Sequence, residues 1–107
     1  MALLHLSDHN FKQEVLASDL PVLVDFWATW CRPCQALAPL LEELSIEYKA
    51  KIKIGKIDVG ASPQTATKYG IMSVPTLIFF KNGKVISQGA GAMSKAEIKR
   101  KIEEELL

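Results

Sequence analysis

The sequence predicts an α/β fold, a central mixed five-stranded sheet flanked by four helices in the order β-α-β-α-β-α-β-β-α. Three observations predict it. Strand-like and helix-like segments alternate along the chain, an apolar run at 21–28 is typical of a strand buried on both faces, and Asn82-Gly83 separates two apolar runs as in a hairpin. With 107 residues the chain is long enough for one core, and we expect a single domain over residues 1–107.

The first elements are a short strand at 3–6, a helix that Ser7 can cap, and the central strand at 21–28. A longer helix begins in the Cys31–Cys34 segment. Its apolar stripe consists of Leu37, Leu40, Leu41, Leu44 and Tyr48. Pro39 lies inside this helix, where it lacks the N–H that the helix needs, so we expect a kink there.

A third strand is predicted at 52–59, followed by a short helix with Ser62 as its N-cap and Pro63 as its first residue. The hairpin strands are predicted at 75–80 and 84–88 around the two-residue turn. Ser94 and Glu97 have the spacing of a capping box, which predicts the start of the last helix. The first three strands are expected to be parallel and the hairpin antiparallel to its neighbour.

Composition and charge exclude several classes of function. The net charge of +1 produces no strong field for nucleic acid or an anionic membrane, and the longest apolar run, at 20–28, is too short to span a bilayer. The N-terminus lacks the basic and apolar regions of a secretory signal. We therefore expect a cytoplasmic protein without nucleic-acid or membrane partners, in a reducing compartment where a structural disulfide is unusual.

The two cysteines, Cys31 and Cys34, are the only ones in the chain. Because Cys31 lies at a predicted helix N-terminus, unpaired N–H groups and the helix dipole favour its thiolate. Cys34 lies one turn further in and is expected to be more buried, so Cys31 is the candidate nucleophile and Cys34 the resolving thiol. The alternative is half of a zinc site, but His5 and His9 are far upstream and we expect no metal.

Asp25 interrupts the apolar central strand. A carboxyl group buried there should have a raised pKa, which makes it a candidate acid/base for Cys34, with Lys56 of the neighbouring strand as a balancing charge. The alternative is a solvated carboxylate at a strand end. Trp30, beside the thiols, is a candidate contact surface, whereas Trp27 is interpreted as a core residue.

Five colinear motifs resemble thioredoxin over essentially the whole chain. They are Phe26-Trp-Ala-Thr-Trp-Cys-Arg-Pro-Cys34, Pro39, Lys56-Ile-Asp58, Tyr69-Gly-Ile-Met-Ser-Val-Pro-Thr76 and Phe80-Lys-Asn-Gly83. The resemblance implies a thioredoxin fold and a protein-disulfide reductase with no bound cofactor. Its redox-active disulfide would be re-reduced by a thioredoxin reductase, with NADPH used only indirectly.

The resemblance also implies roles for individual residues. Cys31 would be the nucleophile, Cys34 the resolving thiol and Asp25 the buried acid/base, with Lys56 beside it. Pro75 would be cis and packed against the disulfide, with Val74 offering backbone hydrogen bonds to a substrate. The residues that would meet disulfide-containing target proteins are Trp30, Arg32, Pro33, Met72, Val74, Pro75, Gly91 and Ala92.

The sequence departs from the family pattern at Arg32, where glycine is usual, and at Gly60, where an acidic residue is common. A cation beside Cys31 should favour the thiolate and make the protein a slightly weaker reductant, unless solvent screens the charge. A disulfide oxidase or isomerase and a binding module without turnover stay open as alternatives. The intact cysteine pair with Asp25 favours catalysis, and a monomer is expected.

Overall fold

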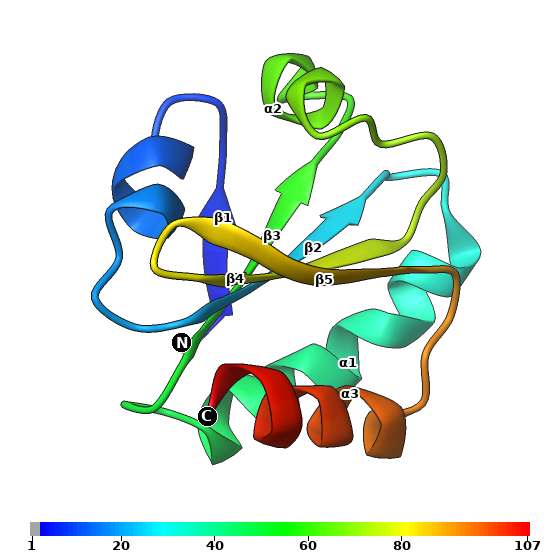
Figure 1. Ribbon diagram of the computed structural model, residues 1–107. Coiled ribbons are helices and arrows are strands. Elements are labelled where there is room, and N and C mark those ends of the chain that lie inside the picture. Colours follow the sequence, from blue (N-terminus) through cyan, green and yellow to red (C-terminus); the bar gives the residue numbers. More distant parts are fainter. Residues whose placement is uncertain (1–2) are drawn as a thin grey trace.

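The computed structural model describes residues 3–107. In chain order, its elements are β1 (Leu3–Leu6), η1 (Lys12–Leu16), β2 (Val22–Trp27), α1 (Arg32–Glu47), β3 (Lys53–Asp58), α2 (Pro63–Lys68), β4 (Thr76–Lys81), β5 (Lys84–Ala90), α3 (Lys95–Lys101) and η2 (Ile102–Leu106). This order confirms the predicted one (Figure 1). The first helix is π-helical and begins at Lys12, later than a cap at Ser7 predicts, and a second π-helical segment extends α3 to Leu106.

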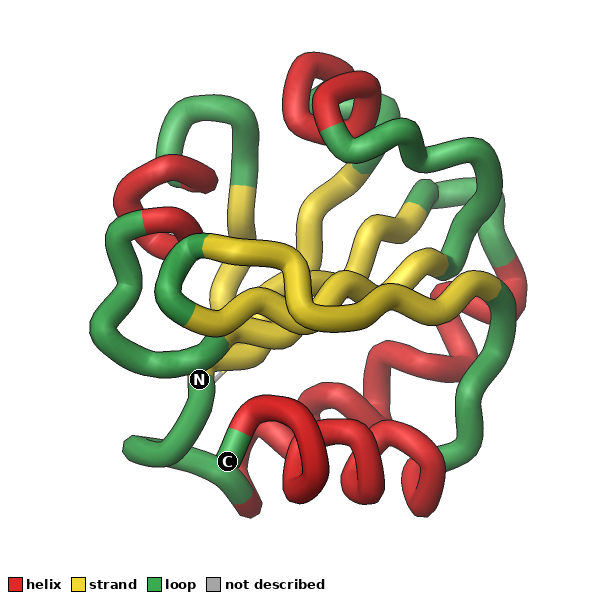
Figure 2. The backbone as a smooth tube through the Cα atoms, viewed as in Figure 1, coloured by secondary structure: helices red, strands yellow, loops and turns green. Residues whose placement is uncertain are grey.

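The five strands form one mixed sheet in the order β1-β3-β2-β4-β5. Strands β1 and β2 both pair with β3 in parallel, β4 pairs with β2 antiparallel, and β5 pairs with β4 antiparallel. The predicted strand directions are therefore confirmed. Figure 2 shows the strands as one layer between two groups of helices.

Two apolar clusters fill the space between the sheet and its helices. Helices α1 and α3, with η2, cover one face, while η1 and α2 cover the other (Figure 1). Because side chains alternate along a strand, Leu23 of β2 packs in the cluster on the α1 and α3 face, and Val24 packs in the cluster on the η1 and α2 face. Both side chains are completely buried. The prediction that the central strand is buried on both faces is confirmed.

The Asn82-Gly83 turn joins β4 and β5 as predicted. Both residues have positive φ, 55° and 76°, which suits a two-residue hairpin turn. A Cβ atom on Gly83 would lie 2.7 Å from the carbonyl oxygen of Leu16. Glycine is therefore required by the backbone conformation and by the close approach of η1.

The cap of α2 differs from the prediction. Ser62 is the N-cap residue, but its side chain makes no capping hydrogen bond. Instead, the carboxylate of Asp8 accepts hydrogen bonds from the backbone N–H groups of Gln64 and Thr65, at 3.2 and 2.8 Å. Ser62 Oγ in turn accepts the N–H of Asp8 at 3.2 Å. The β1–η1 loop thus fixes α2 beside the sheet.

The remaining helix predictions have mixed outcomes. The capping box of Ser94 and Glu97 is confirmed, with both of its hydrogen bonds present. Helix α1 continues across Pro39 without a break, and the expected kink stays a prediction. Among residues 3–107, no helix has the length and apolar character needed to cross a membrane.

Candidate active site

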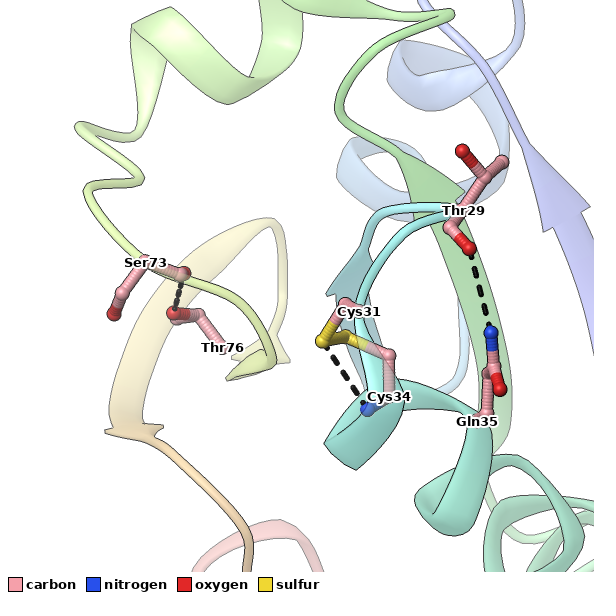
Figure 3. The surroundings of a disulfide bond; sticks show 6 residues. All are labelled: Thr29, Cys31, Cys34, Gln35, Ser73 and Thr76. Atoms are coloured by element: carbon pink, nitrogen blue, oxygen red, sulfur yellow. Dashed lines mark hydrogen bonds between the residues drawn. A yellow bond between two sulfur atoms is a disulfide. The ribbon is translucent and has the colours of Figure 1, made fainter.

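Cys31 and Cys34 form a disulfide at the start of α1 (Figure 3). Cys31 is the N-cap residue with extended backbone, and its Sγ accepts the backbone N–H of Cys34 at 3.2 Å. Arg32 and Pro33 form the first helical turn, where proline is tolerated because its missing N–H has no helical partner. The sequence therefore places one sulfur directly at the positive end of the helix.

The disulfide lies in a small apolar cluster at the carboxyl ends of β2 and β3. Cys31, Cys34 and Ala28 are buried, and Trp27, Val59 and Val74 pack against them. Cys31 is 4% exposed and Cys34 is 2% exposed, so the predicted difference in burial is small in this disulfide form. The contribution of Val59 was not predicted. The sequence signal that could have found it is its position directly after β3. Because parallel strands end at the same edge of a sheet, a residue after β3 is expected to lie near the cysteines that follow β2.

A loop before β4 forms the other side of the site. The Val74–Pro75 peptide bond is cis, which confirms what the resemblance implied. Thr76 Oγ1 donates to the carbonyl of Ser73 at 2.7 Å, within the loop that faces the disulfide in Figure 3. The N–H of Gly91 donates to the carbonyl of Pro75 at 2.9 Å, which links this loop to the end of β5.

The predicted contact residues lie in these loops, and most are exposed. Trp30 is 77% exposed and Met72 is 95% exposed, although both are large and apolar. Arg32, Pro33, Gly91 and Ala92 are also exposed, whereas Val74 is half-buried and Pro75 is buried. We call these eight residues the docking surface. The loops around Cys31 therefore expose large apolar side chains. Such side chains gathered on the surface of a monomer are typical of a site that a partner covers.

Asp25 lies behind the disulfide, on the face of β2 that α1 covers. It is 2% exposed, and its Oδ1 has no hydrogen-bond partner among the described residues. A cavity of about 110 Å³ is lined by Asp25, Cys34 and Lys56, together with Trp27, Gln35 and Ala38. The structure therefore brings the candidate acid/base to the cavity that Cys34 lines.

Burial raises the pKa of Asp25 to about 7, and the positive charge of Lys56 opposes this shift. The raised pKa was predicted from the position of a carboxyl in an apolar strand, and it is confirmed. Lys56 is paired in register with Asp25 on β3, but its Nζ lies over the Trp27 ring, 4.8 Å from the centroid. No ion pair between Asp25 and Lys56 occurs in the described chain.

Comparison with known proteins decides the family. A family model described as Thioredoxin matches residues 2–104. The chain is 46% identical to Thioredoxin 1 of Nostoc sp. over 101 residues, covering 94% of each protein. It is 49% identical to Thioredoxin C-2 of Corynebacterium nephridii over 90% of this chain and 89% of the relative, and 46% identical to a thioredoxin of Buchnera aphidicola over 97% and 96%.

The chain belongs to the thioredoxin family. It is a thiol–disulfide oxidoreductase of protein disulfides, and its redox group is the Cys31–Cys34 disulfide itself. The mixed five-stranded sheet with flanking helices is the thioredoxin fold that the resemblance implied. Among the described residues of this thioredoxin, no group of three or more His, Cys, Asp or Glu side chains is arranged to hold a metal ion.

The two departures from the family pattern have different settings in this thioredoxin. The N–H of Gly60 donates to Asp58 Oδ1 at 2.8 Å, so this position forms part of a turn after β3. Arg32 is exposed at the first residue of α1, between the two cysteines. No carboxylate in residues 3–107 lies within ion-pair distance of its guanidinium.

Proposed function

We propose that this thioredoxin works as a reductant, with Cys31 as the nucleophile and Cys34 as the resolving thiol. The observation that carries this assignment is the hydrogen bond from the Cys34 N–H to Cys31 Sγ at the helix N-terminus. In the dithiol form the same N–H and the helix dipole stabilise a negative charge on Cys31. Cys34 lies within the helix and lines the Asp25 cavity, and its sulfur accepts no hydrogen bond from residues 3–107.

The proposed reaction has two exchanges. The Cys31 thiolate attacks one sulfur of a target disulfide, so that a Cys31–target disulfide forms and the other target sulfur leaves as a thiolate and takes up a proton. Cys34 then loses its proton and attacks Cys31 Sγ, which breaks the mixed disulfide and releases the second target thiol. Two electrons pass to the target, and the Cys31–Cys34 disulfide is regenerated.

We assign the proton transfer at Cys34 to Asp25. A pKa of about 7 lets this carboxyl both accept and release a proton near neutral pH. The cavity that it shares with Cys34 is roomy enough for a water molecule to carry the proton between them. Lys56 is assigned a positioning role, because its charge opposes the rise in the pKa of Asp25.

Targets are proposed to bind at the docking surface. Trp30, in the loop before Cys31, and Met72, in the loop before β4, supply exposed apolar area. The backbone N–H and C=O of Val74 have no hydrogen-bond partner within residues 3–107, so an extended target segment can pair with them as an added strand. Gly91 and Ala92, joined to Pro75 through the Gly91 N–H, complete the surface without side chains that would block approach.

Several further properties belong to this proposal. Electrons would come from NADPH through a thioredoxin reductase, in cytoplasmic electron transport that maintains the thiol balance of the cell. The protein would act as a monomer over residues 1–107, without nucleic-acid or membrane partners. The full-length similarity to bacterial thioredoxins and the net charge of +1 support these proposals.

Reductive precipitation of insulin tests the direction of the reaction. With dithiothreitol as electron source, the native protein should accelerate precipitation, whereas Cys34→Ser should be nearly inactive because it stops at the mixed disulfide. Equal activity of the two would refute the resolving role of Cys34. Replacement of dithiothreitol by NADPH with a purified thioredoxin reductase should sustain turnover. Turnover with glutathione alone, and not with the reductase, would contradict the proposed donor.

A further inference from the structure

The loops that gather around the disulfide are almost uncharged. Four segments meet there, at 27–34, 58–62, 70–76 and 90–94, and their only charged residues are Arg32 and Asp58. Trp27, Val59 and Val74 bring the first three together on the disulfide, and the Gly91–Pro75 hydrogen bond attaches the fourth. Asp25 and Lys56 line the cavity behind Cys34. Within the four loops themselves, any charge preference for targets therefore depends on Arg32 and Asp58.

The carboxylate of Asp58 is engaged by its own loop. Its Oδ1 accepts the N–H of Gly60 at 2.8 Å and that of Ala61 at 3.4 Å. These hydrogen bonds hold it against the turn after β3. It is also not an ion-pair partner of Arg32.

Arg32 is therefore an unopposed cation. The first turn of α1 contains no acidic residue, and the first carboxylate along this helix is Glu42. Ten residues at 1.5 Å each place its backbone about 15 Å away, beyond the roughly 10 Å screening length at 0.1 M salt. Arg32 is exposed and directly follows Cys31 in the chain, so its long side chain can reach a residue that flanks the cysteine that Cys31 attacks.

We propose that Arg32 selects targets that carry a glutamate or aspartate next to the attacked cysteine. This inference rests on the proposed function, because it takes Cys31 as the attacking thiol. An acidic neighbour in the target meets the free guanidinium as the two sulfurs approach, and a basic neighbour is repelled. A rim charge of this kind acts mainly on the rate of encounter and is screened by salt.

The test uses three synthetic peptides, each with one internal disulfide and identical except for Glu, Gln or Lys beside one cysteine. The pre-reduced protein is mixed with each peptide, without a reductase, and the second-order rate constant of peptide reduction is measured at about 10 mM and 500 mM salt. The quantity of interest is the Glu/Lys rate ratio. A change in the thiolate fraction or redox potential of the protein affects all three peptides equally and cancels from this ratio.

Native protein should give a Glu/Lys ratio about two- to fivefold higher than Arg32→Gln at low salt, the range expected for exposed charge pairs. The excess should disappear at high salt, and Arg32→Lys should retain most of it. Arg100→Gln, which removes an exposed arginine far along the chain, is the matched control and should behave as native. A ratio unchanged by Arg32→Gln would overturn the inference alone. Failure of the native protein to reduce any peptide would overturn the proposed function as well.

Discussion

Replacement of Asp25 by asparagine should stabilise the oxidised protein increasingly as the pH rises. Burial raises the pKa of Asp25 from 3.8 to about 7. Below pH 3.8 the carboxyl is protonated in the folded and unfolded states alike, so folding buries no charge and carries no such cost. Between pH 3.8 and 7 the unfolded chain ionises first, and the free energy of unfolding falls by about 1.4 kcal/mol per pH unit. Above pH 7 the accumulated cost levels off at about 4 kcal/mol.

Urea unfolding of oxidised native protein and Asp25→Asn, followed by tryptophan fluorescence at pH 4, 6 and 8.5, measures this cost. The buried amide has its own penalty, but that penalty does not depend on pH. The difference in free energy of unfolding should therefore shift by about 4 kcal/mol in favour of the variant between pH 4 and 8.5. Asp19→Asn, at an exposed carboxyl, is the control and should show no such shift. A difference that stays constant across this pH range would refute the reasoning.

Three further predictions are tested by substitutions at other positions. Arg32→Gly should lower the reduction potential by roughly 20 mV in a glutathione redox buffer, because it removes about 1 kcal/mol of thiolate stabilisation, and an unchanged or higher potential would contradict this. Gly83→Ala should cost more than about 1 kcal/mol of stability, since φ is 76° and the new Cβ would lie 2.7 Å from the Leu16 carbonyl oxygen. Thermal unfolding of both glycine variants measures this effect. Gly70→Ala should lower stability less, because it introduces positive-φ strain but its Cβ would meet no atom within 4 Å. Equal losses of stability in the two variants would argue against a clash between the Cβ added at Gly83 and Leu16. Asp8→Ala should lower the melting temperature by removing both side-chain caps of α2, and an unchanged value would show that these hydrogen bonds contribute nothing.

Features governed by neighbours in the sequence were predictable. The apolar run of β2, the Asn82-Gly83 turn and the Ser94–Glu97 capping box each depend on residues within one element or one turn. The raised pKa of Asp25 was also predictable, because a carboxyl in a strand buried on both faces loses its hydration wherever the neighbouring strands lie.

Features that depend on tertiary approach were not predictable in the same way. The α2 cap comes from Asp8, 56 residues before Gln64, and nothing local indicates that contact. The packing of Val59 on the disulfide depends on the register of β2 and β3, which pairs Trp27 with Asp58 and so places Val59 just beyond the end of β2. The cis Val74–Pro75 bond was implied only by resemblance, since most bonds before proline are trans.

The central claim is that Cys31 attacks and Cys34 resolves. Its most direct test is to mix reduced Cys34→Ser and Cys31→Ser, separately, with a peptide that contains one disulfide, then quench with acid and locate adducts by mass spectrometry. The account predicts a stable mixed disulfide at Cys31 in the first variant and little or no adduct in the second. A faster-forming adduct at Cys34 would contradict it.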